Sequence, residues 1–160
     1  MRLTALAFVV CLAAAGAAQA GTVNVSFAAK DRFSDAGSTP WDEKANREAI
    51  AQYLQTLGPR YLAADQNLKV EILDIDLAGE PRPLARHGRE LRVVKGRADW
   101  PRITLRYTLE SNGKVLRSGE ETVSDMSYTS HVPEPRASEP LHYEKRMLSE
   151  WFRKRFTRPD

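Results

Sequence analysis

Apolar residues recur along the chain with two different spacings, which predict strands and helices. Every second residue is apolar in the segments 22–27 and 102–111, as in strands that have one buried face. In the segments 40–57 and 141–156 the spacing is three or four residues, as on one side of a helix. We therefore expect the first two segments to lie in a sheet and the other two to pack against it as helices.

Local signals predict the ends of the first helix and the position of its tryptophan. Thr39 can cap the helix and Pro40 suits its first position, whereas the Gly-Pro pair at 58–59 should end it. Trp41 has helical spacing to the apolar residues that follow it, and Trp151 belongs to the apolar stripe of the second helix. We expect both side chains to pack in the core rather than to form an aromatic binding surface.

The apolar segment "LKVEILDIDLAG", 68–79, contains Asp74 and Asp76 two residues apart. Strict alternation would place both carboxylates on the buried face, at a cost of several kcal/mol each. We therefore expect the strand to bulge or twist near Ile72, with Asp74 pairing with a basic side chain and Asp76 shaping the strand exit. The alternative is a metal site formed by Asp74, Asp76 and Asp125, which would serve a metal-dependent hydrolase.

The strongest short-range signal is Asn112-Gly113, which predicts a two-residue hairpin turn directly after the strand at 102–111. Gly119, in the strand that follows, is expected at a bulge or bend, because the apolar positions beyond it leave the register set by the turn. A shorter strand is expected at "LRVV", 91–94.

These elements predict an α+β fold in the order β-α-β-β-β-β-α. The β-α-β opening gives a parallel pair of strands and the hairpin adds antiparallel ones, so the sheet should be mixed, with four to five strands. Both main helices should pack on one face of this sheet, which makes a two-layer structure. We expect one α/β domain over residues 21–160.

The N-terminus predicts export from the cytoplasm. Arg2 is followed by an apolar run and by "AQA", a small-x-small cleavage site that ends at Ala20, so residues 1–20 are expected to be a signal peptide. The apolar run is too short to span a membrane. The mature chain would begin at Gly21 in the periplasm and would contain no integral membrane segment.

Charge is nearly balanced overall but uneven along the chain. Loss of Arg2 with the signal peptide lowers Lys and Arg from 24 to 23 against 21 Asp and Glu, a balance that does not favour nucleic acid as a partner. Between residues 81 and 102, however, seven basic residues accompany two acidic ones. These cations either form a solvated surface or, through Arg86, Arg89 and Arg92, contact an anionic envelope component or an envelope protein.

Few residues have the spacing that catalysis or metal binding requires. His87, His131 and His142 form no H-E-x-x-H or H-x-H motif, and the single cysteine, Cys11, lies in the predicted signal peptide. We therefore expect no cofactor. Trp100, which precedes a proline at a strand entrance, is expected to be the freest tryptophan and the place where a ligand would stack.

Three segments together resemble a bacterial family known as domain of unknown function 3016. They are "VEILDIDLAG", "RVVKGRADWPRITLRYTLESNGKVLRSGEETVSDMSY" and "LHYEKRMLSEWFRKRF". The resemblance implies an exported, single-domain protein without an assigned activity, so it transfers no catalytic residues to this chain. The residues themselves favour a non-enzymatic periplasmic binding or interaction module of the cell envelope, with the metal-dependent hydrolase as the alternative.

Overall fold

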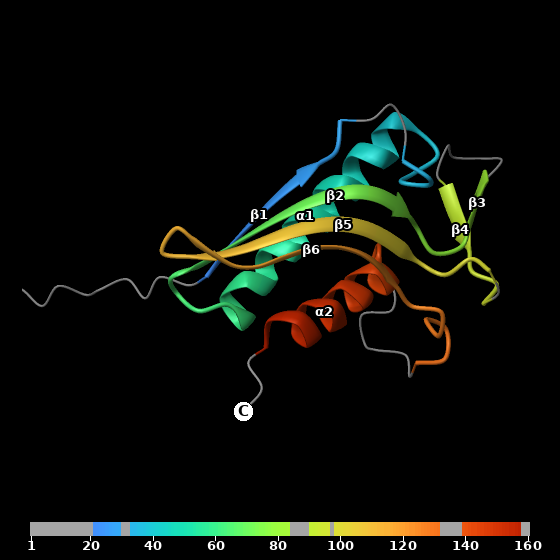
Figure 1. Ribbon diagram of the computed structural model, residues 1–160. Helices are drawn as coiled ribbons and strands as arrows, with labels where there is room; N and C mark the ends of the chain where they lie inside the picture. Colours follow the sequence, from blue (N-terminus) through green and yellow to red (C-terminus); the bar gives the residue numbers. More distant parts are fainter. Residues whose placement is uncertain (1–20, 30–32, 84–89, 97, 132–138, 158–160) are drawn as a thin grey trace, which may run out of the picture.

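The computed structural model describes residues 21–29, 33–83, 90–96, 98–131 and 139–157 (Figure 1). The predicted signal peptide, Arg86, His87 and Arg89 therefore lie outside the described residues. The helices and strands are, in chain order, β1 (Thr22–Phe27), α1 (Pro40–Tyr61), β2 (Gln66–Asp76), β3 (Glu80–Pro83), β4 (Glu90–Val93), β5 (Arg102–Ser111), β6 (Lys114–Ser124) and α2 (His142–Phe156).

The main sheet is mixed and has the strand order β1-β2-β5-β6. β1 and β2 are parallel, as expected of strands joined through a helix, and the other neighbours are antiparallel. The predicted α+β class and element order are confirmed. The short strand predicted at "LRVV" is part of β4, which pairs with β3 in a separate two-stranded sheet.

Both helices cover one face of the main sheet, and the core lies between the two layers (Figure 1). β5 shows why only one face is buried, because Ile103, Leu105 and Tyr107 point to the helices while Thr104 and Arg106 point away. The largest fully buried side chains come from both helices, from β2 and β5, and from the segments next to them: Ile50, Leu54, Leu57, Leu68, Ile72, Ile75, Leu77, Ile103, Leu105, Tyr128, Leu148 and Phe152.

The bulge predicted in β2 is present. The register between β2 and β5 shifts between Ile72 and Asp74, so Leu73 is an extra residue without a partner in β5. Ile72 and Ile75 are consequently both buried, although they are three positions apart and strict alternation would place them on opposite faces. Asp74 and Asp76 then lie on the face away from the helices, which avoids the cost of burying two carboxylates.

α1 begins as predicted and ends later than predicted. Its N-cap is Thr39, whose Oγ1 accepts a hydrogen bond from the Asp42 backbone N–H at 3.2 Å. The expected stop at 58–59 is wrong, because the helix continues to Tyr61 with Pro59 in its last turn. The fixed φ of proline is compatible with a helix, and so close to the helix end only one backbone donor is lost.

The β5–β6 hairpin has the predicted turn but a different bulge. Asn112 and Gly113 have φ angles of 50° and 77°, as a two-residue turn between twisted strands requires. The register shift lies at Leu116, so the expectation for Gly119 is wrong. Gly119 instead faces the ring of Tyr107, and a Cβ atom there would lie 3.1 Å from the Tyr107 hydroxyl oxygen. This glycine makes room for the aromatic ring.

The tryptophans on the two helices have different environments. Trp151 is buried, as predicted, and its Nε1 donates to Glu121 at 3.1 Å. Trp41 is 81 % exposed, so the prediction that it packs in the core is wrong. The buried residues of α1 start at Ile50, and Trp41 lies more than two turns before that point. Helical spacing alone did not show where the covered part of the helix begins.

Candidate functional site

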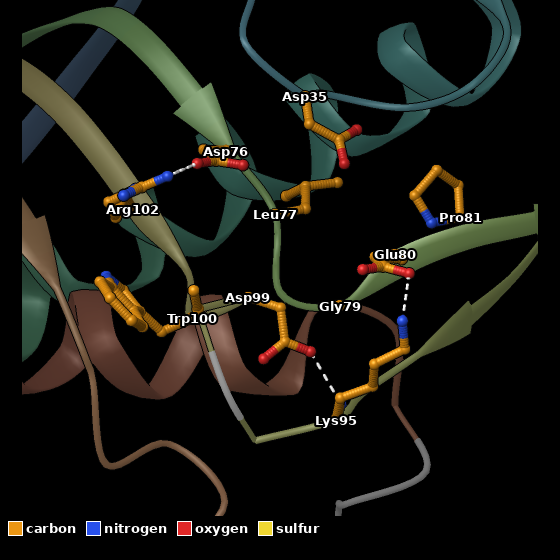
Figure 2. A pocket seen from close by; sticks show the side chains of 11 residues that line it. Asp35, Asp76, Leu77, Gly79, Glu80, Pro81, Lys95, Asp99, Trp100 and Arg102 are labelled. Carbon is orange, nitrogen blue, oxygen red and sulfur yellow. Dashed lines mark hydrogen bonds and ion pairs between the residues drawn. The ribbon is translucent and has the colours of Figure 1, made fainter.

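A pocket of about 510 Å³ opens at the end of β2, where the chain leaves the main sheet. We call it the β2-end pocket. It lies at the end of the molecule where both helices begin and where the small β3–β4 sheet stands (Figure 1). Its volume is within the range of small-molecule binding sites. The lining residues are Asp35, Asp76, Leu77, Gly79, Glu80, Pro81, Lys95, Ala98, Asp99, Trp100 and Arg102 (Figure 2).

The pocket floor is the segment 77–79, which follows β2. On one side Asp35 lies beside β2, with its backbone N–H donating to the Ile75 carbonyl at 2.8 Å and its carbonyl accepting from the Leu77 N–H at 3.0 Å. Gly79 then turns the chain with a φ of 76°. A Cβ atom at Gly79 would lie 2.8 Å from the Val93 carbonyl oxygen, so this position requires glycine on two grounds.

Arg92 of β4 holds this floor through hydrogen bonds. Its guanidinium forms an ion pair with the Asp35 carboxylate, and it donates to the carbonyls of Ala78 at 2.9 Å and Gly79 at 3.0 Å. The Arg92 side chain is only 21 % exposed. Arg92 was predicted to contact an anionic partner, but several of its side-chain donors bond to the protein itself. The predicted contact with that partner is therefore left to Arg86 and Arg89.

Glu144, near the start of α2, contacts the same floor. Its Oε1 accepts a hydrogen bond from the Ala78 backbone N–H at 2.7 Å. The residue is 3 % exposed, and burial raises the pKa of its carboxyl despite this hydrogen bond and the nearby charge of Arg92. α2 is therefore tied to the pocket floor through a buried acid that no sequence motif marks.

Two ion pairs line the open part of the pocket. On one wall Arg102 Nε donates to Asp76 at 3.0 Å, and the same guanidinium lies 5.6 Å from the centre of the Trp100 ring. On the other wall Lys95 forms an ion pair with Glu80 (Figure 2). Each wall thus presents a hydrogen-bond donor beside an acceptor.

Asp99 joins the loop before β5 to the rest of the pocket. Its carboxylate accepts from the Lys95 backbone N–H at 2.7 Å and from the Tyr128 hydroxyl at 2.9 Å. Burial and this hydrogen bond raise the pKa of Tyr128 to about 12, so the phenol stays a neutral donor. Tyr128 itself is buried.

The residues of the alternative metal site are separated. Asp76 lines the pocket, but Asp74 accepts from the backbone N–H of Ser34 at 3.0 Å and also from its hydroxyl. Asp125 accepts from the Ser127 N–H at 3.0 Å, as expected of a turn residue. Within the described ranges, no group of three or more His, Cys, Asp or Glu side chains is placed to hold a metal ion.

The structure brings together residues from both sequence hypotheses and adds others. Trp100 and Asp76 meet in the pocket, where Asp76 forms an ion pair with Arg102. Sequence reasoning missed the other charged residues of the lining: Asp35, Glu80, Lys95 and Asp99. The last two lie in "VKGRADWP", whose glycine and proline indicate a loop but not the partners of the loop.

Residues 21–154 match the model of a family described as protein of unknown function (DUF3016), so the chain belongs to this family, as the sequence resemblance predicted. No curated protein matches the chain. Neither of the two helices described here combines the length and the apolar composition needed to cross a membrane. The family description assigns no activity.

Proposed function

We propose that the protein is a non-enzymatic binding module of the bacterial cell envelope, located in the periplasm, which holds its ligand in the β2-end pocket. The observation that carries this proposal is a preformed pocket whose walls combine Trp100 with two ion pairs. Its floor is held by Arg92 and Glu144 from two other elements. A site fixed in this way loses little entropy when a ligand binds.

The engagement of the pocket carboxylates supports binding over catalysis. Asp35 bonds to Arg92, Asp76 to Arg102, Glu80 to Lys95, and Asp99 to Tyr128. A general acid or base needs a pKa near the working pH and access to the reacting proton. Carboxylates that already accept from cations or from a neutral phenol are poorly suited to that task. The separation of Asp74 and Asp125 from the pocket likewise gives the hydrolase alternative less support.

The predicted export signal supports the periplasmic location. The family match begins at Gly21, the residue that the expected cleavage would place first. Gly21 is buried, and a Cβ atom there would lie 2.3 Å from the Leu62 Cβ. Gly21, the residue that follows the predicted signal peptide, is therefore itself part of the packed fold.

The proposal is tested with purified residues 21–160 and two kinds of envelope material, namely isolated cell-wall polysaccharide and vesicles that contain an anionic phospholipid. Binding is expected to fall strongly in Trp100→Ala. Trp41→Ala is the matched control, because Trp41 is exposed and lies outside the pocket lining. Binding that Trp100→Ala leaves unchanged would contradict the assignment to the pocket.

The same material tests the predicted contribution of Arg86 and Arg89. If an anionic partner contacts them, binding should weaken with salt, because exposed charges are screened over about 10 Å at 0.1 M ionic strength. The double change to Ser should then remove the salt dependence. A melting temperature raised by Ca²⁺, Mg²⁺ or Mn²⁺ in the wild type but not in Asp76→Asn would instead favour the hydrolase.

A further inference from the structure

The β2-end pocket offers an apolar surface beside polar groups. Trp100 is only partly buried and lines one side, and Leu77 and Pro81 add apolar atoms to the lining (Figure 2). An aromatic ring of this kind contributes a flat apolar face that ligands with axial C–H groups can cover. This surface alone would accept many apolar ligands, so the polar groups must decide which chemical class of ligand binds.

The polar groups occur as donor–acceptor pairs that remain accessible. The side chains of Arg102 and Asp76 are 45 % and 25 % exposed, and those of Lys95 and Glu80 are 38 % and 54 % exposed. A carboxylate has about four acceptor positions and a guanidinium five N–H donors, so the acids can accept and the cations can donate further hydrogen bonds while each pair stays together. Hydroxyl groups both donate and accept, and adjacent hydroxyls match a donor beside an acceptor.

The charge of the lining disfavours ionic ligands. Among the described residues, the lining includes four carboxylates, Asp35, Asp76, Glu80 and Asp99, and two cations, Lys95 and Arg102. An anion would meet more negative than positive groups, even when Arg92 is counted because it pairs with Asp35. A cation would have to compete with Lys95 or Arg102 for carboxylates that they already bind. An uncharged ligand meets neither obstacle.

We infer that the β2-end pocket binds an uncharged polyhydroxylated ligand, a saccharide, with Trp100 against one face of a sugar ring and the Arg102–Asp76 pair bonded to its hydroxyls. This inference rests on the proposed function and narrows its ligand from envelope material in general to the glycan part. In this arrangement the ion pairs orient the ligand and Trp100 supplies contact area.

Three tetrasaccharide probes of different charge test the inference by calorimetry. They are the uncharged β-1,4-linked N-acetylglucosamine oligomer, the deacetylated glucosamine oligomer, which is cationic, and a galacturonic acid oligomer, which is anionic. The uncharged probe is expected to bind residues 21–160 most tightly and with little salt dependence. Its affinity should fall about tenfold in Trp100→Ala, as expected from the loss of one aromatic contact.

Control variants keep the result interpretable. Trp41→Ala should bind the uncharged probe as the wild type does, and circular dichroism melting shows that each variant is folded. Arg102→Lys keeps the charge beside Asp76 but loses the planar guanidinium. It should lower the affinity for the uncharged probe more than Trp41→Ala does.

The outcomes separate this inference from the proposed function. Tighter Trp100-dependent binding of the anionic or the cationic probe would overturn the inference that the ligand is uncharged and leave the pocket assignment intact. The same holds if no probe and no envelope polysaccharide binds while the anionic vesicles still bind in a Trp100-dependent way. If that material binds equally well to Trp100→Ala, the proposed function itself fails.

Discussion

Arg106 and Arg92 both bond to carboxylates, but they do so in regions of very different character. Arg106 lies on the open face of the sheet, 55 % exposed, and bridges Glu71 at 2.9 Å and Glu120 at 3.0 Å on the neighbouring strands. Arg92 contacts the pocket floor, is 21 % exposed, and bonds to Asp35 and to backbone carbonyls. Water screens the first set of contacts far more than the second, so the second should contribute more to stability.

The two regions also differ in how the chain brings the partners together. On the open face, the register of adjacent strands already places Arg106 beside Glu71 and Glu120. At the pocket, Arg92 and Asp35 are 57 residues apart, and Ala78 and Glu144 are 66 residues apart. Long-range contacts of this kind join the small sheet, β2 and α2. A pocket arises there because elements that are not neighbours in one sheet meet without filling the space between them.

The largest expected effect is that of Arg92→Ala. The change leaves the Asp35 carboxylate without this ion pair and the carbonyls of Ala78 and Gly79 without a donor. The free energy of unfolding, measured with urea, should fall by about 2–3 kcal/mol. Arg92→Lys keeps the charge without the fork and should cost less. A loss for Arg92→Ala no larger than that for Arg106→Ala would contradict the difference between the regions.

A smaller effect, which depends on pH, is expected for Glu144→Gln. Burial raises the pKa of Glu144 in the folded chain, so the folded state favours the neutral carboxyl. Wild-type stability should therefore fall as the pH rises from the ordinary glutamate pKa through the raised one, and this contribution should be constant above it. The slope from one proton is at most about 1.4 kcal/mol per pH unit.

The glutamine retains an oxygen that can accept from the Ala78 N–H, but it cannot ionise. The difference in stability between Glu144→Gln and the wild type isolates this group, because other titrations common to both chains cancel. The variant should gain on the wild type as the pH rises, measured by urea unfolding at several pH values. The charged groups that act on Glu144 most strongly are Arg92 and Asp35. A difference that stays constant with pH would mean that Glu144 does not titrate differently on folding.

The smallest effect is expected for Arg106→Ala. Its contacts with Glu71 and Glu120 are exposed, and the two carboxylates remain hydrated when the guanidinium is removed. Urea unfolding should detect little change at physiological salt, and any change at low salt should disappear when salt is added. A large loss that persists at high salt would show that the open face is more than a solvated surface.

Much of the architecture was predictable because its signals are local. The hairpin followed from Asn112-Gly113 between alternating residues, and the start of α1 from Thr39 and Pro40. The bulge near Ile72 was predictable because two carboxylates cannot remain on a buried face of a strand. Two residues of the candidate site were predictable from the sequence: Trp100, a large side chain before a strand without an apolar stripe to join, and Asp76, a carboxylate within an apolar strand.

The sequence by itself determined the α+β class, the mixed sheet, both helices and the side of the sheet to which Asp74 and Asp76 turn, because each depends on spacing within one or two adjacent elements. Only the tertiary structure decided which residues line the β2-end pocket and that Trp41 stays exposed. Those outcomes depend on where the β3–β4 sheet and the first turns of the helices lie relative to the end of β2. Periodicity specifies which face of an element is buried, but not how far along its length another element covers it.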